Sequence, residues 1–407
     1  MTVRALDSRG KAVDAILSEL RIAASRPMED AMAMPPSVYT SREILDLESE
    51  RIFRHEWICV GRESTLAKSG DYVTSEIVGQ PLVVIRGRDE KIRAYSNVCL
   101  HRMSTLLVGS GNAQVIVCPY HGWCYNIDGT LRAAPHMEAN RGFCKADYQL
   151  PELRCEIWEG WIYVTLNPAI QPVADRLKPL YELIGRYRMG EYVETFREDH
   201  VWNTNWKILA ENFMESYHLP ILHRLTVGPH SRVEDMNCPP GGETFNYHWI
   251  TKEASLPIGN AHPSNKHLKG EWRKTTALVT IYPTHLITLT PGYFWYLIVQ
   301  PRDVDKVHMV YGGGMAPEFI ADPKGLEYLT ELKTILDAVN HEDQRGVEGV
   351  FIGMQARLAK GGHLSHLERP NYEFGRYLAH RLGVLNTTVE SAKSRGIPIG
   401  PAASNKT

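Results

Sequence analysis

The sequence predicts an α+β protein with two parts, a small all-β domain and a larger domain in which helices cover an antiparallel sheet. Three observations predict this class. Short apolar runs broken by turn residues fill 70–167, and strand-like runs rich in aromatic residues return over 244–315. The longest pattern of apolar residues at helical spacing covers 323–360. With 407 residues and 43% hydrophobic content, the chain can bury a sizeable core and hold two or three domains.

The composition excludes several classes of partner. Lys and Arg number 45 against 47 Asp and Glu, a net charge of -2, and no run of five basic residues occurs, so neither nucleic acid nor an anionic membrane is expected. No stretch of 18 apolar residues occurs and charges interrupt the first 30 residues, which predicts a cytoplasmic protein without a secretory signal. The seven cysteines form an odd, dilute set, typical of reduced thiols or metal ligands.

Several elements can be predicted in chain order. The N-terminal residues are polar with one weak helical pattern, and we expect a mobile arm that packs on a partner or frays. A helix follows, for which Thr40 and Glu43 are expected to form a capping box. In the all-β domain, Asp128-Gly129 predicts a hairpin turn. The expected parts are an arm of 1–39, an all-β domain of 57–165, a larger domain of 40–56 with 166–384, and a loosely attached tail of 385–407.

Two cysteines and two histidines stand at metal-ligand spacing in the all-β domain. They form the pairs Cys99-Leu-His101 and Cys118-Pro-Tyr-His121, with 16 residues between the pairs. Each predicted loop offers one thiolate and one imidazole, which fits a structural zinc or a two-iron, two-sulfur cluster with histidine on one iron. Zinc fingers with these ligands place both cysteines before both histidines. The interleaved order therefore favours the cluster.

A second group of candidate ligands lies in the larger domain. On a continuous helix, Glu211, Glu215 and His218 would share one face with Leu222. His218 and His223 would stand about 140° apart, so both can bind one metal only if the helix ends or bulges between them. Pro220 predicts that break. Two histidines flanking a break beside carboxylates indicate a metal site.

The long helix of 326–358 offers a carboxylate as the third ligand. Asp343 falls in line with its apolar stripe, where a bare carboxylate must be paired, hydrogen-bonded or metal-bound. An ion pair of Asp343 with Arg345 or Lys207 is the alternative, and Glu342 is the second choice of ligand. Two histidines and one carboxylate leave open positions on a metal, as in non-haem ferrous sites that activate oxygen. The expected stripe is Leu329, Leu332, Leu336, Val339, Asp343, Val347, Val350, Met354 and Leu358.

The first group of ligands resembles the Rieske iron–sulfur family. Its pattern is C-x-H followed by C-x-x-H, and CPYHGWCYNIDG (118–129) matches the second loop closely. The resemblance implies a Rieske [2Fe–2S] domain over 57–165. It also implies that Cys99 and Cys118 hold one iron and that His101 and His121 hold the other. Met103 stands where the family usually has glycine, so the conformation of the turn in the first loop is not predicted.

Residues 40–384 resemble the oxygenase α subunits of the Rieske non-haem iron oxygenases. The match lies in both cluster loops, in the Asn-Trp-Lys to His-x4-His segment, and in the Glu-Asp helix followed by Gln355 and NYEFGRYL. The resemblance implies a helix-grip type catalytic domain in which His218, His223 and Asp343 hold ferrous iron and Asn212 sits beside them. It implies that Glu215 links His218 to His121 of a neighbouring subunit.

The same resemblance implies the activity and the partners. The protein is expected to be a terminal oxygenase that uses O2 to monooxygenate or dioxygenate a small organic substrate. Its electrons would come from NAD(P)H through a separate reductase, directly or through a ferredoxin. The expected assembly is an α3 trimer, with or without β subunits. A Rieske-type electron-transfer protein without oxygenase activity is the alternative, and a zinc protein is a further rival.

The sequence leaves two substrate classes open, an aromatic ring compound and a quaternary ammonium compound. The family's aromatic-ring dioxygenases often carry Asp at the bridging position, one residue further from the Asn, whereas the Asn212 to His218 segment is similar to members that oxidise quaternary amines. Aromatic residues over 245–296 could cage a trimethylammonium group or simply be sheet core. They are Phe245, Tyr247, Trp249, Trp272, Tyr282, Tyr293, Phe294, Trp295 and Tyr296.

Overall fold

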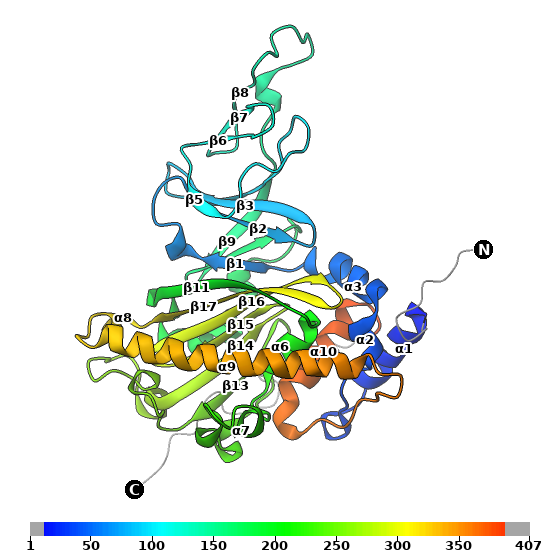
Figure 1. Cartoon of the computed structure of the whole chain (residues 1–407), viewed down its shortest axis with the longest axis vertical. Helices are drawn as coiled ribbons and strands as arrows, with labels where there is room; N and C mark the ends of the chain where they lie inside the picture. The colour runs from blue at the N-terminus through cyan, green and yellow to red at the C-terminus, as the bar shows by residue number, and fades with distance from the viewer. Residues whose placement is uncertain (1–11, 387–407) are drawn as a thin grey trace. The chain divides into compact units, whose positions relative to one another are not determined.

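The computed structural model describes residues 12–386, which divide into two compact units (Figure 1). The smaller unit is Phe53–Val173, and the larger unit is formed by the chain on both sides of it. The first 11 residues of the expected arm and all but two residues of the expected tail lie outside the described residues. The predicted α+β class is confirmed, because the first unit is built from antiparallel strands and the second covers an antiparallel sheet with helices.

The smaller unit contains two antiparallel sheets. Gly129 has a φ of +83° in the turn between β7 and β8, which confirms the predicted Asp128-Gly129 hairpin. The seven-stranded sheet has the order β1 (Ile58–Arg62), β10 (Trp161–Thr165), β9 (Glu152–Trp158), β4 (Ile92–Ser96), β3 (Gln80–Arg86), β2 (Asp71–Ile77) and β5 (Ser110–Asn112). The three-stranded sheet has the order β6 (Val115–Val117), β7 (Cys124–Asn126) and β8 (Leu131–Ala133).

The larger unit is organised around one seven-stranded antiparallel sheet. Its central strands are almost entirely buried, which follows from their long apolar runs. Helix α9 runs across one face of this sheet (Figure 1). The strand order is β11 (Val193–Trp202), β17 (Lys306–Met315), β16 (Tyr293–Asp303), β15 (His285–Leu289), β14 (Thr275–Ile281), β13 (Phe245–Thr251) and β12 (Met236–Asn237).

The helices of the larger unit come from both ends of the chain. The α-helices are α1 (Val13–Ala24), α2 (Pro36–Thr40), α3 (Arg42–Glu48), α4 (Val173–Arg176), α5 (Lys178–Ile184), α6 (Trp206–Met214), α7 (Leu219–Leu222), α8 (Pro317–Ile320), α9 (Gly325–Met354) and α10 (Arg369–Arg381). Short 3-10 segments include η7 (Gly228–His230) and η11 (His366–Glu368), and η2 (Ser49–Phe53) is a π-helix.

The expectation of a mobile N-terminal arm is wrong over the described residues. Ile16 and Leu20 of α1 are fully buried. The Tyr372 hydroxyl and the Arg376 guanidinium, both on α10, donate to backbone carbonyls at the end of α1 and just after it. The weak apolar pattern therefore belongs to a helix that packs on its own chain.

Two local predictions about helices are also wrong. The residue that caps α3 is Ser41, whose hydroxyl accepts from the Ile44 amide, because Thr40 is the buried last residue of α2. The buried stripe of α9 follows the expected residues only as far as Val347 and then continues at Phe351. Val350 is 48% exposed because the stripe continues four residues after Val347, at Phe351, instead of three. Leu358 is 91% exposed and lies beyond the end of α9 at Met354.

Candidate metal centres

The two histidines of the larger unit flank a one-turn helix. Helix α6 ends at Met214, and Glu215 has extended backbone dihedrals. His218 and His223 then stand immediately before and after α7. The continuous helical face expected through Glu211, Glu215 and His218 is therefore wrong.

The helix breaks before His218 instead of at Pro220. Pro220 lies in the first turn of α7, where a backbone N–H has no partner within the helix, so proline does not break it. The break has a local cause in Glu215, whose carboxylate accepts hydrogen bonds from the backbone amides of Tyr217 and His218. These amides are held by a side chain in place of a helical carbonyl.

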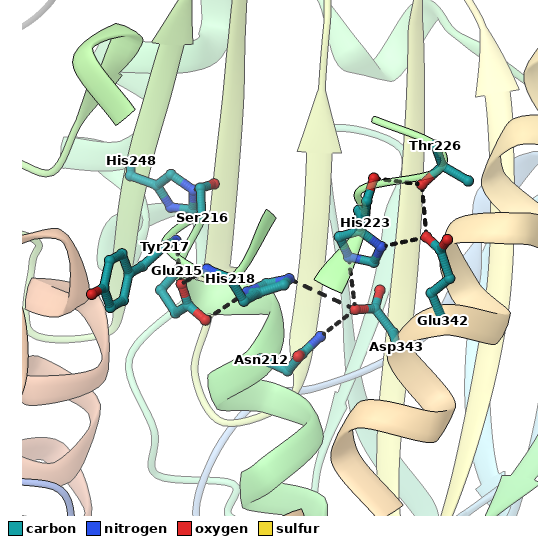
Figure 2. A network of polar contacts seen from close by, with 10 residues as sticks. All are labelled: Asn212, Glu215, Ser216, Tyr217, His218, His223, Thr226, His248, Glu342 and Asp343. Carbon is teal, nitrogen blue, oxygen red and sulfur yellow. Dashed lines mark hydrogen bonds and ion pairs between the residues drawn. The ribbon is translucent and has the colours of Figure 1, made fainter. Parts of the chain in front are cut away.

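The structure brings His218, His223 and Asp343 to one point (Figure 2). One potential ligand atom from each lies within 4.8 Å of the others. Nε2 of His218 lies 3.7 Å and Nε2 of His223 lies 3.0 Å from Oδ1 of Asp343. Asn212 donates from Nδ2 to the same carboxylate oxygen at 2.9 Å. Lys207, an alternative partner for Asp343, instead binds Glu48.

Two further carboxylates fix the orientation of the histidine rings. Nδ1 of His218 lies 2.6 Å from Oε1 of Glu215, and Nδ1 of His223 lies 2.8 Å from Oε2 of Glu342. Thr226 donates its hydroxyl to the same Glu342 oxygen at 2.7 Å. A carboxylate that accepts from Nδ1–H sets the ring tautomer and leaves the lone pair of Nε2 available to a metal, as at many metal sites.

Sequence reasoning considered Glu342 only as a substitute for Asp343 and missed its contact with His223. The available signal was its place beside Asp343 on a helix already expected to reach the site. Neighbours in a helix project about 100° apart, so the two carboxylates meet different atoms of one imidazole.

The electrostatics of this site fit a cation. His223 is fully buried, and its Nε2 has no hydrogen-bond partner of good geometry. Burial alone would lower the pKa of His223, but the adjacent Asp343 and Glu342 carboxylates outweigh it and raise the pKa. Two imidazole nitrogens and one carboxylate are a donor set that suits ferrous iron with open positions.

A hydrogen bond between Ser216 and His248 supports the segment between the two helices. Ser216 Oγ lies 2.6 Å from Nε2 of His248, which belongs to β13. Burial, with a contribution from His218, lowers the pKa of His248 to about 3, so this ring is neutral. The sequence offered no signal for the pair, because 32 residues separate its members.

The four candidate cluster ligands lie on two loops of the smaller unit. Cys99 and Cys118 are 1% and 3% exposed. The ring centroids of His101 and His121 lie 4.7 Å apart, and His101 stacks on Trp123. Nδ1 of His101 is buried without a hydrogen-bond partner, as expected for a nitrogen reserved for a metal. Two thiols beside two imidazoles therefore fit a Rieske cluster.

Nearby groups make the cysteines suitable ligands. Burial alone would raise the pKa of Cys118, but the backbone amides of Tyr120 and His121 help to bring it below its usual value, toward the thiolate that binds metals. Tyr125 places its hydroxyl 3.5 Å from Sγ of Cys99 and accepts from the Leu100 amide at 3.0 Å. Sequence reasoning did not single out Tyr125.

The departure at Met103 has a structural consequence. Met103 adopts a φ of +53° in the first loop, and its amide donates to the Cys99 carbonyl at 3.0 Å. Glycine reaches this left-handed conformation without steric cost, which explains the family's usual residue. The loop keeps the turn with methionine, whose side chain is 77% exposed.

The aromatic residues over 245–296 do not converge on one site. Along β13, Phe245, Tyr247 and Trp249 alternate with His248, so they lie on the sheet face opposite to the one that meets Ser216. Trp272 packs against Trp249 on that opposite face. Trp295 lies on the same face as α6, where its ring contacts Phe213 at a centroid distance of 5.3 Å. A cage at the metal centre can therefore use few of the nine residues.

Comparisons with known proteins agree with this arrangement. Residues 189–383 match the family described as the ring hydroxylating alpha subunit (catalytic domain), and residues 56–154 match the Rieske [2Fe-2S] domain. The carnitine monooxygenase oxygenase subunit of Escherichia coli (strain K12) is 30% identical over 351 residues, covering 82% of this chain and 87% of the relative. The chloroplastic choline monooxygenase of Arabidopsis thaliana is 25% identical over 368 residues, covering 88% and 84%.

Solved structures share the fold. The quaternary ammonium Rieske monooxygenase CntA in complex with L-carnitine superposes with a TM-score of 0.74 at 23% identity, covering 89% of this chain and 98% of CntA. Naphthalene 1,2-dioxygenase from Rhodococcus sp. bound to indole superposes with a TM-score of 0.77 at 20% identity, covering 91% and 98%. Within residues 12–386, no helix is both long and apolar enough to cross a membrane.

Proposed function

This chain belongs to the Rieske non-haem iron oxygenases as a ring-hydroxylating α subunit, and from that membership we propose that His218, His223 and Asp343 bind its mononuclear iron. The carrying observation is that ligand atoms of these three residues lie within 4.8 Å of one another while Glu215 and Glu342 hold the Nδ1 atoms of the two histidines. We also propose that Cys99 and Cys118 bind one iron of the Rieske cluster. His101 and His121 would bind the other.

The protein is a terminal oxygenase, and its own residues prepare the site for that reaction. Iron bound with open positions supplies the activation of O2. Asn212 holds one oxygen of Asp343, which fixes the carboxylate against rotation. Glu215 and Glu342 hold the two imidazoles in one tautomer, with Nε2 of each ring turned toward Asp343. Membership of the oxygenase family does not favour the alternative of a bare electron carrier.

The oxygenase works with an electron-transfer partner, and we propose a head-to-tail trimer as its assembly. In the smaller unit, Met103 is 77% exposed and Tyr120, next to His121, is 57% exposed. In the larger unit, Tyr217, whose amide donates to Glu215, is 52% exposed, and Ile221 of α7 is 78% exposed. Apolar groups exposed beside both centres fit a heterologous contact in which each cluster meets the iron site of the next subunit.

Electrons would cross from His121 through Glu215 to His218. A reductase would supply them, with or without a ferredoxin, and β subunits are not required by this contact.

Replacing Glu215 with Ala is expected to slow electron transfer between the centres at least about tenfold, because outer carboxylates of ligand histidines contribute factors of that order. Single-turnover oxidation of the pre-reduced cluster, followed by its visible absorption, measures the step. Glu342→Ala is the matched comparison, since it also removes an outer carboxylate, from His223, but leaves the proposed bridge in place. A larger loss in Glu215→Ala than in Glu342→Ala identifies the bridge. Equal rates in wild type and Glu215→Ala, with iron retained in both, would remove the bridging role.

We propose that the substrate is a quaternary ammonium compound. Support comes from the Asn212 to His218 spacing, from the two relatives named for carnitine and choline oxidation, and from Trp295, which offers a partly accessible aromatic face beside Phe213.

Iron-replete protein with a generic NADH reductase should couple O2 uptake to oxidation of carnitine-like or betaine-like amines. Aromatic acids should be turned over at least about tenfold more slowly, the loss expected for an unmatched cation–π contact of one or two kcal/mol. Coupled turnover of aromatic acids alone would contradict this substrate class.

A further inference from the structure

A cavity whose wall carries several polar groups lies in the larger unit beside α6. Its volume is about 140 Å³, and its wall combines α1, α2, α6, α10, η11 and the end of α9. Most of the wall is apolar, but Tyr39, Glu211, Glu368 and Asn371 also line it. Cavities of this size that carry polar groups hold water. Oδ1 of Asn371 is a buried acceptor without a partner, which makes this wall more polar still.

The cavity shares part of its wall with a second hollow. A groove of about 440 Å³ shares the lining residues Ala23, Met32 and Ala33 with it. The groove also carries the charged side chains of Glu19 and Lys360. The groove and the cavity therefore adjoin at a wall of small or flexible side chains.

Two carboxyl groups, those of Glu211 and Glu368, line the cavity. The Tyr39 hydroxyl lies 2.8 Å from both oxygens of Glu211, and burial raises the pKa of Glu211 to about 8, with Glu368 adding to the rise. Glu211 is thus largely protonated at neutral pH. Burial also raises the pKa of Glu368, and the charge of Glu215 adds to that rise. Glu368 therefore lies within electrostatic range of both Glu211 and Glu215.

The reaction of this enzyme class needs protons at the iron site. Hydroxylation of a C–H bond by O2 consumes two electrons and two protons, placing one oxygen atom in the product and the other in water. The reductase supplies the electrons, and the protons come from solvent. The carboxylates of Glu215 and Glu342 hold the two imidazoles, so the groups that store protons for the reaction must be others.

We propose that this cavity is a water-filled proton reservoir for the oxygenase. Protons enter from the groove, are held at Glu211, and move over cavity water to Glu368, on the side nearest the pair formed by Glu215 and His218. Electrons and protons would thus approach the iron site from different directions, the electrons through the subunit contact and the protons from within the larger unit.

The first test examines water access without turnover. In the metal-loaded resting protein moved into D2O, the infrared C=O stretch of protonated Glu211 should shift within seconds, and Glu211→Gln should identify the band by removing it. Gly375→Leu fills the cavity, because a Cβ at Gly375 meets only the flexible end of Met34 at 3.4 Å. This variant should slow the exchange at least about tenfold. Slow exchange in wild type, or unchanged exchange in Gly375→Leu, would overturn the reservoir.

The second test examines proton delivery in the loaded enzyme. Glu368→Gln should lower substrate turnover at least about tenfold and increase the solvent isotope effect, because it removes a group that exchanges protons. Anaerobic cluster reduction should stay unchanged. Glutamine can replace Glu368 in its capping box with Ser365, so folding is preserved. Glu327→Gln, at an exposed position in the first turn of α9, is the matched control. Normal turnover and isotope effect in Glu368→Gln would overturn proton delivery and leave the iron site as proposed.

Discussion

Replacing Asp343 with Ala is expected to empty the mononuclear site and abolish substrate oxidation while the cluster remains. Only two imidazoles would be left as ligands, and Asn212 would lose its acceptor. Catalysis by bound metal contributes several kcal/mol, so turnover should fall about a thousandfold or more. The cluster should stay because its four proposed ligands lie in the other compact unit.

Metal analysis and visible absorption separate these effects. Iron should fall from about three atoms per chain to about two, with the cluster's absorption unchanged. Glu331→Ala, at an exposed position of the same helix, is the control and should retain all three. An Asp343→Ala protein that keeps three irons per chain would exclude Asp343 as a ligand. A wild-type protein that lacks the third iron would favour the zinc or electron-carrier interpretation.

Replacing Lys207 with Met is expected to lower the free energy of unfolding by about 3–5 kcal/mol, because it leaves the charge of Glu48 buried and unpaired. Nζ of Lys207 lies 2.8 Å from Oε1 of Glu48, and Trp206 donates from Nε1 to Oε2 at 2.8 Å. Both members of the ion pair are fully buried. Burial raises the pKa of Glu48 and lowers that of Lys207, against the attraction between them.

A double variant tests the physical reason. Because burial outweighs the attraction, Lys207→Met combined with Glu48→Leu should recover most of the loss or exceed wild-type stability. Urea unfolding followed by tryptophan fluorescence gives the shift of the transition for each variant. If Lys207→Met unfolds at the same urea concentration as wild type, Glu48 is not charged in the folded protein.

The local motifs could be recognised from the sequence because their ligands are close neighbours in the chain. Cys99 with His101, and Cys118 with His121, each need only one tight loop, and the β6–β7 hairpin brings the second loop into shape. The predicted strands over 244–315 likewise follow from apolar runs rich in aromatic residues, which are a local property of the sequence. Asp343 stood out because a carboxylate interrupted an apolar stripe.

Other features depended on contacts between distant residues. The partner of His223 on Nδ1 is Glu342, 119 residues away, and Asn212 meets Asp343 across 131 residues. The end of α6 was set by the carboxylate of Glu215 instead of by Pro220. Helical periodicity describes which residues share a face, but it does not report a side chain that turns back to bind its own backbone.

The sequence by itself therefore determined the fold class, the family and the kinds of metal that the protein carries, since ligand spacing and apolar periodicity are local properties. Only the tertiary structure decided which carboxylates orient the histidines, which aromatic residues share a face with α6, and where a polar cavity adjoins that helix. Those features arise when segments from both ends of the chain pack against one sheet, and their packing depends on shape and burial at long range, which no local pattern encodes.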